Sequence, residues 1–183
     1  MDNQLTPLHT PLPRKFLSGD PVTEANTQTP TITPEQLLKY WQGHRALTRR
    51  VIDAFPESDL FNYSIGGMRT MSGYAMEFLG MAVPTLVGVN TKTWEEGEKK
   101  DKPATKADLL NAWDEATAGI DREWAKIPAT RWQETETAFG QWTMPVYSLI
   151  QYIIDNEVHH RGQGYVYLRA LGIEPPPFYE RPF

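Results

Sequence analysis

A cluster of polar residues interrupts an amphipathic pattern near the end of the chain, within residues 156–163. One set of positions recurs every four and three residues and therefore shares a single helix face: Leu149, Ile153, Asn156, His160, Gln163 and Tyr167. This face is apolar at first and becomes polar at Asn156, His160 and Gln163. Because burying an unpaired polar group costs roughly 2–7 kcal/mol, such side chains must be hydrogen-bonded or bound to a metal. The pattern predicts a polar site inside a helix bundle.

Glu77 is a second candidate, because it is the only charged residue between positions 71 and 89. Its isolation among apolar residues predicts that part of the carboxylate lies in a low-dielectric environment. A buried carboxylate takes up a proton, a cationic partner or several hydrogen-bond donors. His160, Arg161 or a metal ion could be that partner. We therefore expect Glu77 and His160 to meet inside the bundle, as metal ligands or as a metal-free hydrogen-bonded pair; the alternative is that they have separate, exposed roles.

Further polar and aromatic residues could line a pocket beside this site. His44 falls on the apolar face of an earlier segment, and Trp41 lies one turn before it. Glu157 lies close to the polar face, but its spacing from Arg161 favours a simple i,i+4 ion pair. Gln163 extends the polar face by one turn. His44 or Glu157 could assist proton transfer, and nothing in the sequence selects between them, so no catalytic residue is assigned.

The first of four expected helices has the clearest boundaries. Thr33 is a suitable N-cap, Pro34 suits the first helical position, and Gln36 completes a capping box. The helix should stop at Phe55, because Pro56 disfavours helical geometry in the residue before it.

Three more helices complete the expected bundle. The second spans about 70–91 by its apolar pattern, and the third opens at Thr105 and ends before Pro128. The fourth is expected from about Thr143, with Pro145 in its first turn, to Leu171, where Gly172 provides a C-terminal cap. Four long helices with few strand signals predict an all-α fold, a four-helix bundle.

The remaining segments are expected to be irregular. Residues 1–32 are rich in Pro and Thr and are interpreted as an extended N-terminal arm, outside a bundle of residues 33–172. Residues 56–69 are expected to form a loop. Residues 129–143 fit either a short strand or an irregular crossing. Residues 173–183 contain three consecutive prolines and form an extended C-terminal tail.

The bulk properties exclude several classes of protein. The net charge of −5 over 183 residues argues against a nucleic-acid binder. Arg45, Arg49 and Arg50 are interpreted as a solvated helix face. The chain has no cysteine, so any metal would need nitrogen or oxygen ligands. The apolar stretch 71–89 contains glycine and proline and fits a central core helix better than a membrane span. A cytoplasmic location is expected, because no signal-peptide pattern is visible.

Two segments resemble one known family. Asn156-Glu157-Val158-His159-His160-Arg161-Gly162-Gln163 is similar to the fourth-helix signature of the DinB-like family, also called YfiT-like metal-dependent hydrolases. Ser64-Ile65-Gly66-Gly67-Met68-Arg69, followed by Met76-Glu77, looks like the family's second-helix region. The resemblance implies a divalent metal, zinc or nickel, held by one histidine of the second helix and two of the fourth. Carried over by position, the implied ligands are Glu77, Asn156 and His160, of which only His160 keeps the family's residue type.

The same resemblance implies two classes of function. The first is a metal-dependent hydrolase, or a transferase that uses a small thiol cofactor, acting on a small-molecule substrate. The alternative is a non-catalytic bundle for small-molecule binding or stress-associated dimerisation, in which the polar cluster only fixes the register of the helices. Homodimerisation is expected in either case. A nucleic-acid or membrane partner is not expected.

Overall fold

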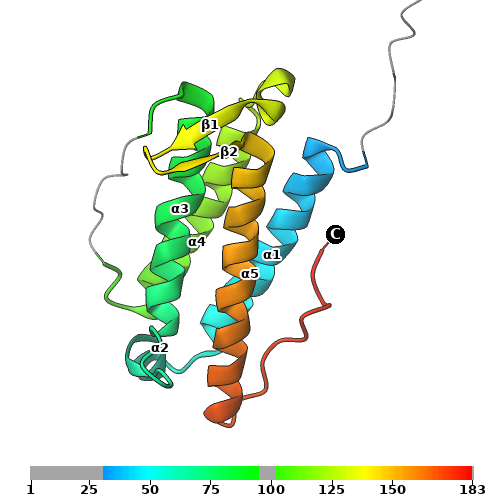
Figure 1. Ribbon diagram of the computed structural model, residues 1–183. Coiled ribbons are helices and arrows are strands. Elements are labelled where there is room, and N and C mark those ends of the chain that lie inside the picture. Colours follow the sequence, from blue (N-terminus) through cyan, green and yellow to red (C-terminus); the bar gives the residue numbers. More distant parts are fainter. Residues whose placement is uncertain (1–30, 95–101, 183) are drawn as a thin grey trace, which may run out of the picture. The chain divides into compact units, whose positions relative to one another are not determined.

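The computed structural model describes residues 31–94 and 102–182, and Figure 1 shows their arrangement. Four long helices form the fold: α1 (Pro34–Ala54), α3 (Met71–Thr91), α4 (Lys106–Trp124) and α5 (Val146–Ala170). The prediction of an all-α four-helix bundle is confirmed. The predicted N-terminal arm lies outside the described residues except for positions 31 and 32, so it stays a prediction. None of the helices in the described ranges is long and apolar enough to cross a membrane.

The helices pack in a ring in which α1 and α3 each contact both α4 and α5. Their directions follow from contacts near their ends. Asn90, near the end of α3, donates to the carbonyl of Glu123 near the end of α4 at 2.9 Å, so these two helices run the same way. Tyr167, near the end of α5, donates to the carbonyl of Arg69 just before α3 at 2.9 Å, so α3 and α5 are antiparallel. Antiparallel packing brings the middle of α5 beside the middle of α3.

The boundaries with strong capping signals lie where the sequence places them. Thr33 accepts from the Gln36 backbone, and the Gln36 side chain accepts from the Thr33 backbone, so the capping box is complete. Phe55 is the C-cap of α1. Gly172 follows α5 with a φ of 77°, a conformation that glycine adopts without steric cost.

Two connecting segments contain more regular structure than the sequence established, although a short strand was one of the two alternatives for residues 129–143. The predicted loop 56–69 includes a short helix, α2 (Glu57–Asn62), which buries Leu60 in the core. Residues 129–145 form a 3₁₀ helix, η1 (Ala129–Gln133), and an antiparallel hairpin of β1 (Thr135–Ala138) and β2 (Trp142–Pro145).

The hairpin moves the start of α5. Thr143 pairs with Thr137 in the ladder, and Pro145 is the N-cap rather than a residue of the first turn. The predicted start at Thr143 was therefore wrong by three residues. The reason is local: Phe139 and Gly140, with φ values of 51° and 66°, make a tight turn that commits the following residues to strand pairing.

The hydrophobic core has two parts, separated along the bundle by polar residues. One part surrounds Trp41 and Trp124, and the other surrounds Phe78 and Trp113. The positions between them on α1 and α5 carry a buried polar layer: His44, Arg45, Thr48, Glu157 and Arg161. The candidate site and this layer occupy adjacent faces of α5.

The C-terminal tail, residues 173–182, leaves α5 and returns beside α1 and α5 (Figure 1). Arg50 of α1 donates to the carbonyl of Glu180 at 2.7 Å. A methyl group built on Gly43 of α1 would overlap the carbonyl oxygen of Pro182, so the tail and this helix are in close backbone contact. The tail is therefore part of the packed structure.

Candidate functional site

The structure brings together the three residues that the sequence places at one site. Glu77 lies on α3, and Asn156 and His160 lie one turn apart on α5. Asn156 Nδ2 donates to Glu77 Oε1 at 3.2 Å, and His160 Nε2 is 3.9 Å from the same oxygen. The side chains of Glu77 and His160 are 24% and 14% exposed, so the cluster opens toward solvent on one side. Its position fits a site that a small molecule can reach.

The imidazole of His160 is held on both sides. Its ring stacks on Tyr74 of α3, with ring centres 4.4 Å apart and planes 15° apart. His160 Nδ1 is 3.0 Å from Gln163 Oε1, one turn further along α5. When Nδ1 donates to this amide oxygen, Nε2 is left facing Glu77. Gln163 therefore orients the imidazole toward the carboxylate, which is the role of a positioning residue.

A residue outside the helices compensates the charge of Glu77. Arg69 Nη1 forms an ion pair with Glu77 Oε2, although the contact lacks the direction of a hydrogen bond. The Arg69 guanidinium also lies over the Tyr74 ring, 5.1 Å from its centre. Arg69 ends the segment 64–69 that carries part of the family resemblance, but its contact with Glu77 was not predicted. Loop residues follow no helical period, so spacing gave no signal for this contact.

The donor set meets the requirements of a resident metal only in part. The 3.9 Å between His160 Nε2 and Glu77 Oε1 is close to the sum of two metal–ligand bonds, about 4.2 Å. However, Asn156 presents its amide nitrogen to Glu77, and Arg69 already neutralises the carboxylate. Within the described ranges, no group of three His, Cys, Asp or Glu residues is placed to hold an ion. As arranged here, the cluster does not fit a resident divalent metal.

A cavity of about 410 Å³ adjoins this cluster. Its walls come from α3, from the hairpin and from the first half of α5, and they are mainly apolar: Met81, Phe139, Trp142, Met144, Leu149 and Ile153. Glu77 provides a charged group in this wall, at the end farther from the hairpin. The arrangement can enclose an apolar body and contact a polar group at one end.

The other predicted pocket residues form a separate buried cluster. Glu157 Oε1 accepts from Thr48 at 2.6 Å, and Glu157 Oε2 lies 3.5 Å from Arg45 Nη1 and 3.4 Å from Trp41 Nε1. The expected Glu157–Arg161 ion pair was wrong, because the carboxylate turns toward α1. The interpretation of Arg45 as a solvated residue was also wrong, because its side chain is 1% exposed. It occupies the α1 face that packs against α4 and α5.

Arg161 and His44 complete this cluster. Arg161 Nη1 donates to Thr48 Oγ1 at 3.1 Å, and Arg161 Nη2 lies 2.9 Å from His44 Nδ1. Burial, and then the charges of Arg161 and Arg181, lower the pKa of His44 from 6.5 to about 3. A neutral His44 accepts the guanidinium hydrogen bond. His44 and Trp41 therefore support the helix packing, and neither lines the cavity beside Glu77.

Comparisons with known proteins agree with this architecture. The DinB family profile matches residues 24–183. A DinB-like protein from Bacillus cereus ATCC 10987 has a similar structure, with 20% identity and a TM-score of 0.65, covering 79% of this chain and 97% of that one. The DinB-like protein YjoA from Bacillus subtilis has 17% identity and a TM-score of 0.66, covering 79% and 96%. None of the curated proteins compared with the chain is a significant match. With the family profile spanning the whole described bundle, the chain belongs to the DinB family.

Proposed function

We propose that this DinB-family protein binds a small molecule in the cavity between α3, the hairpin and α5, and that it does so without a resident metal. The observation that carries the proposal is the position of Glu77. The residue lines the cavity, and its carboxylate is ion-paired with Arg69 and accepts one hydrogen bond from Asn156, which leaves Oε2 able to accept another. A ligand with an apolar body and a hydrogen-bond donor at one end would match the apolar walls and the carboxylate.

The chemistry available to the ligand comes first from Glu77, which lines the cavity, and then from His160, which does not line it but lies 3.9 Å from Glu77 Oε1. The carboxylate accepts hydrogen bonds, and the imidazole can hold or release a proton at Nε2 while Gln163 holds Nδ1. The separation of 3.9 Å leaves room for a ligand atom to approach both groups. These groups support binding of a small molecule as the primary function. Proton transfer is the reaction that their side chains could assist.

A metal-dependent hydrolase or thiol transferase is the second candidate. It is favoured by the same 3.9 Å separation, at which one divalent ion, zinc or nickel, could contact both Glu77 and His160. Arg69 would have to leave the carboxylate, and the Asn156 amide would have to turn its oxygen inward. Arg69 is 55% exposed, so its departure is sterically open.

Zinc titration followed by calorimetry separates the two candidates. The native chain should bind zinc weakly, because Arg69 competes for Glu77. Asn156→His should strengthen binding markedly, since it restores a second imidazole one turn from His160. Val166→His is the matched control, because position 166 is exposed on the same helix and has no histidine three or four residues away. Stoichiometric zinc in the purified native chain, lost on chelation together with thermal stability, would replace our proposal with the second candidate.

Ligand binding is tested with Gly80→Leu. Gly80 lines the cavity, and a methyl group built on it meets no atom within 4 Å, so a leucine would fill the cavity without displacing the helix. Compounds from a fragment library that shift the melting temperature should lose this effect in Gly80→Leu and in Glu77→Gln. If every hit binds both variants as well as it binds the native chain, the cavity is not the binding site.

Homodimerisation remains part of this proposal. Trp142, Tyr147 and Tyr152, around the start of α5, are large side chains with about half of their surface exposed, and they would suit an interface between two copies. Sedimentation of the native chain and of Tyr152→Glu tests the idea. A native chain that sediments as a monomer at all concentrations would exclude a homodimer.

A further inference from the structure

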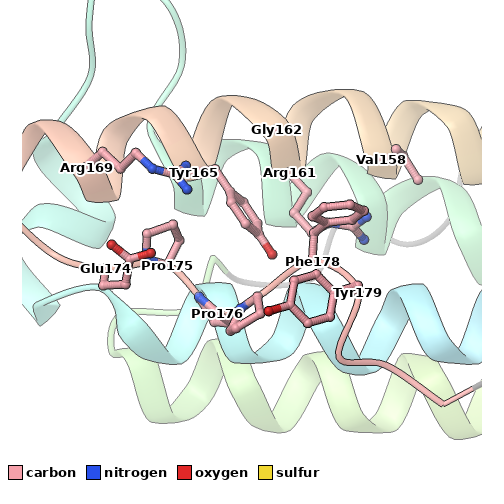
Figure 2. A pocket seen from close by; sticks show the side chains of 11 residues that line it. Val158, Arg161, Gly162, Tyr165, Arg169, Glu174, Pro175, Pro176, Phe178 and Tyr179 are labelled. Atoms are coloured by element: carbon pink, nitrogen blue, oxygen red, sulfur yellow. The ribbon is translucent and has the colours of Figure 1, made fainter.

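A second cavity, of about 530 Å³, lies between α5 and the C-terminal tail. We call it the tail pocket. Figure 2 shows the side chains of α5 on one side and the tail on the other. The tail contributes one wall of this pocket, which is apolar and partly aromatic: Pro175, Pro176, Pro177, Phe178 and Tyr179. The pocket shares no lining residue with the cavity beside Glu77.

The inner part of the tail pocket carries a buried positive charge. Arg161 lines the pocket and is only 5% exposed. Within the described residues, its hydrogen-bond partners, His44 and Thr48, are neutral. The nearest buried carboxylate, Glu157, makes its own contacts with Arg45 and Thr48.

Two charged neighbours act on Arg161 from opposite sides of the balance. Arg181 of the tail reaches His44 Nδ1, the same nitrogen that Arg161 contacts, at 3.3 Å. Burial lowers the pKa of Arg161, and Arg181 lowers it further, while Glu157 opposes the shift. A buried cation without a directly bound anion is costly. The inner end of the pocket is therefore suited to a negatively charged group.

Tyr165 supplies a hydroxyl group at the same place. Its oxygen is buried, and in the described part of the chain it has no hydrogen-bond partner. In Figure 2 the Tyr165 side chain extends from α5 toward the tail, with the hydroxyl oxygen directed at the space beside Phe178. Burial raises the pKa of Tyr165, so the hydroxyl keeps its proton and can donate it. An acceptor in the pocket would satisfy this group.

The outer end of the pocket differs in charge. Arg169 and Glu174 both lie there, where α5 ends and the tail begins (Figure 2). Their opposite charges offset each other, so the uncompensated charge is at Arg161. We propose that the tail pocket binds a small aromatic carboxylate, with its carboxylate at Arg161 and Tyr165 and its ring between the prolines and Phe178. A planar guanidinium suits a carboxylate, and proline and aromatic faces suit a flat ring.

Benzoate is the probe for this site, with the isotopically labelled full-length chain followed by NMR titration. Benzoate at millimolar concentrations should shift the amide signals of Gly162 and Tyr165, and benzyl alcohol, which lacks the charge, should not. Phenyl phosphate tests whether the preferred anion is a phosphate. If it binds at least tenfold more tightly than benzoate, the assignment of a carboxylate ligand is wrong.

Two matched glycine variants locate the binding. Gly162 lines the tail pocket and Gly80 lines the other cavity, and a methyl group built on either meets no atom within 4 Å. Gly162→Leu should abolish benzoate binding, and Gly80→Leu should leave it unchanged. The reverse pattern, or loss in neither variant, overturns the proposal.

Tyr165→Phe tests the polar contact without the risk of unfolding that Arg161→Gln carries. It removes a hydroxyl that has no partner in the described residues, so the fold should be as stable as before or more so. Benzoate binding should weaken about threefold to tenfold, the usual effect of one hydrogen bond. Unchanged affinity in Tyr165→Phe would show that the hydroxyl does not contact the anion, contrary to the proposal.

Discussion

Glu157→Gln tests whether the buried polar layer depends on charge compensation. The substitution keeps the size of the side chain and removes its charge. In the native structure, Glu157 Oε2 is 3.5 Å from Arg45 Nη1, and the two side chains are 2% and 1% exposed. Glutamine would leave the buried Arg45 without an anion and would direct an N–H group at one of its donors, Thr48, Trp41 or Arg45.

The magnitude follows from this geometry. Two unit charges 3.5 Å apart attract by about 5 kcal/mol at an effective dielectric constant of about 20. Removing one partner of a buried pair typically costs about 3–5 kcal/mol, because the other charge stays buried. For a domain of this size each kcal/mol lowers Tm by about 2–4 °C. We expect a decrease in Tm of roughly 6–20 °C for Glu157→Gln.

Urea unfolding and calorimetry measure this decrease, and Asp114→Asn is the matched control. Asp114 accepts two hydrogen bonds from Arg49, at 2.7 and 2.9 Å, so it also joins α1 to another helix. The Arg49–Asp114 side chains are 41% and 51% exposed, and breaking the pair should cost less than about 1 kcal/mol. Equal destabilisation by the two variants would refute the reasoning from burial.

Two further predictions concern the same layer and the tail. His44 has a pKa of about 3 in the folded chain against 6.5 when unfolded, so between these values the unfolded state binds more protons and stability falls as pH falls. The loss should be about 2 kcal/mol from pH 7 to pH 5 by urea unfolding; His44→Gln should remove that contribution, whereas exposed His159→Gln should not. Gly43→Ala should push away the Pro182 carbonyl and detach the tail, measured as faster exchange of the Glu180 and Arg181 amides. Unchanged exchange there would contradict the close packing of Gly43 and the tail.

The fold was predictable where local chemistry and periodicity agree. The capping box at Thr33 predicts the start of α1 from local sequence alone, without any tertiary contact. Gly172 predicts the end of α5 in the same way. The hairpin was harder to predict from the sequence, because its four-residue strands are too short to show a clear alternation of apolar and polar residues. Its register depends on pairing, and that pairing sets the start of α5.

The candidate site was predictable in its positions and less so in its partners. The spacing of Asn156 and His160, together with the isolation of Glu77, was enough to predict that these residues meet. Arg69 reaches Glu77 from a loop, so no helical spacing indicates the contact. Arg45 was misjudged because an arginine on an amphipathic helix usually faces solvent. Its burial is explained by partners that lie far away in sequence, the Glu157 carboxylate and the Trp113 ring and carbonyl.

The charges of α5 and its neighbours connect the polar layer to the tail pocket. Glu77 is compensated by Arg69, and Glu157 by Arg45, which leaves Arg161 as the buried cation with neutral hydrogen-bond partners. Glu157 still attracts Arg161 through space.

Glu157→Gln should therefore have opposite effects on stability and on binding. The substitution removes a negative charge near Arg161, so the inner end of the tail pocket becomes more positive. Benzoate should therefore bind more tightly, although the fold is less stable. NMR titration well below the melting temperature of the variant measures the affinity. Weaker binding by a Glu157→Gln chain that keeps the native pattern of amide signals would mean that the anion does not respond to the charge at Arg161, and the carboxylate would then need another position in the pocket.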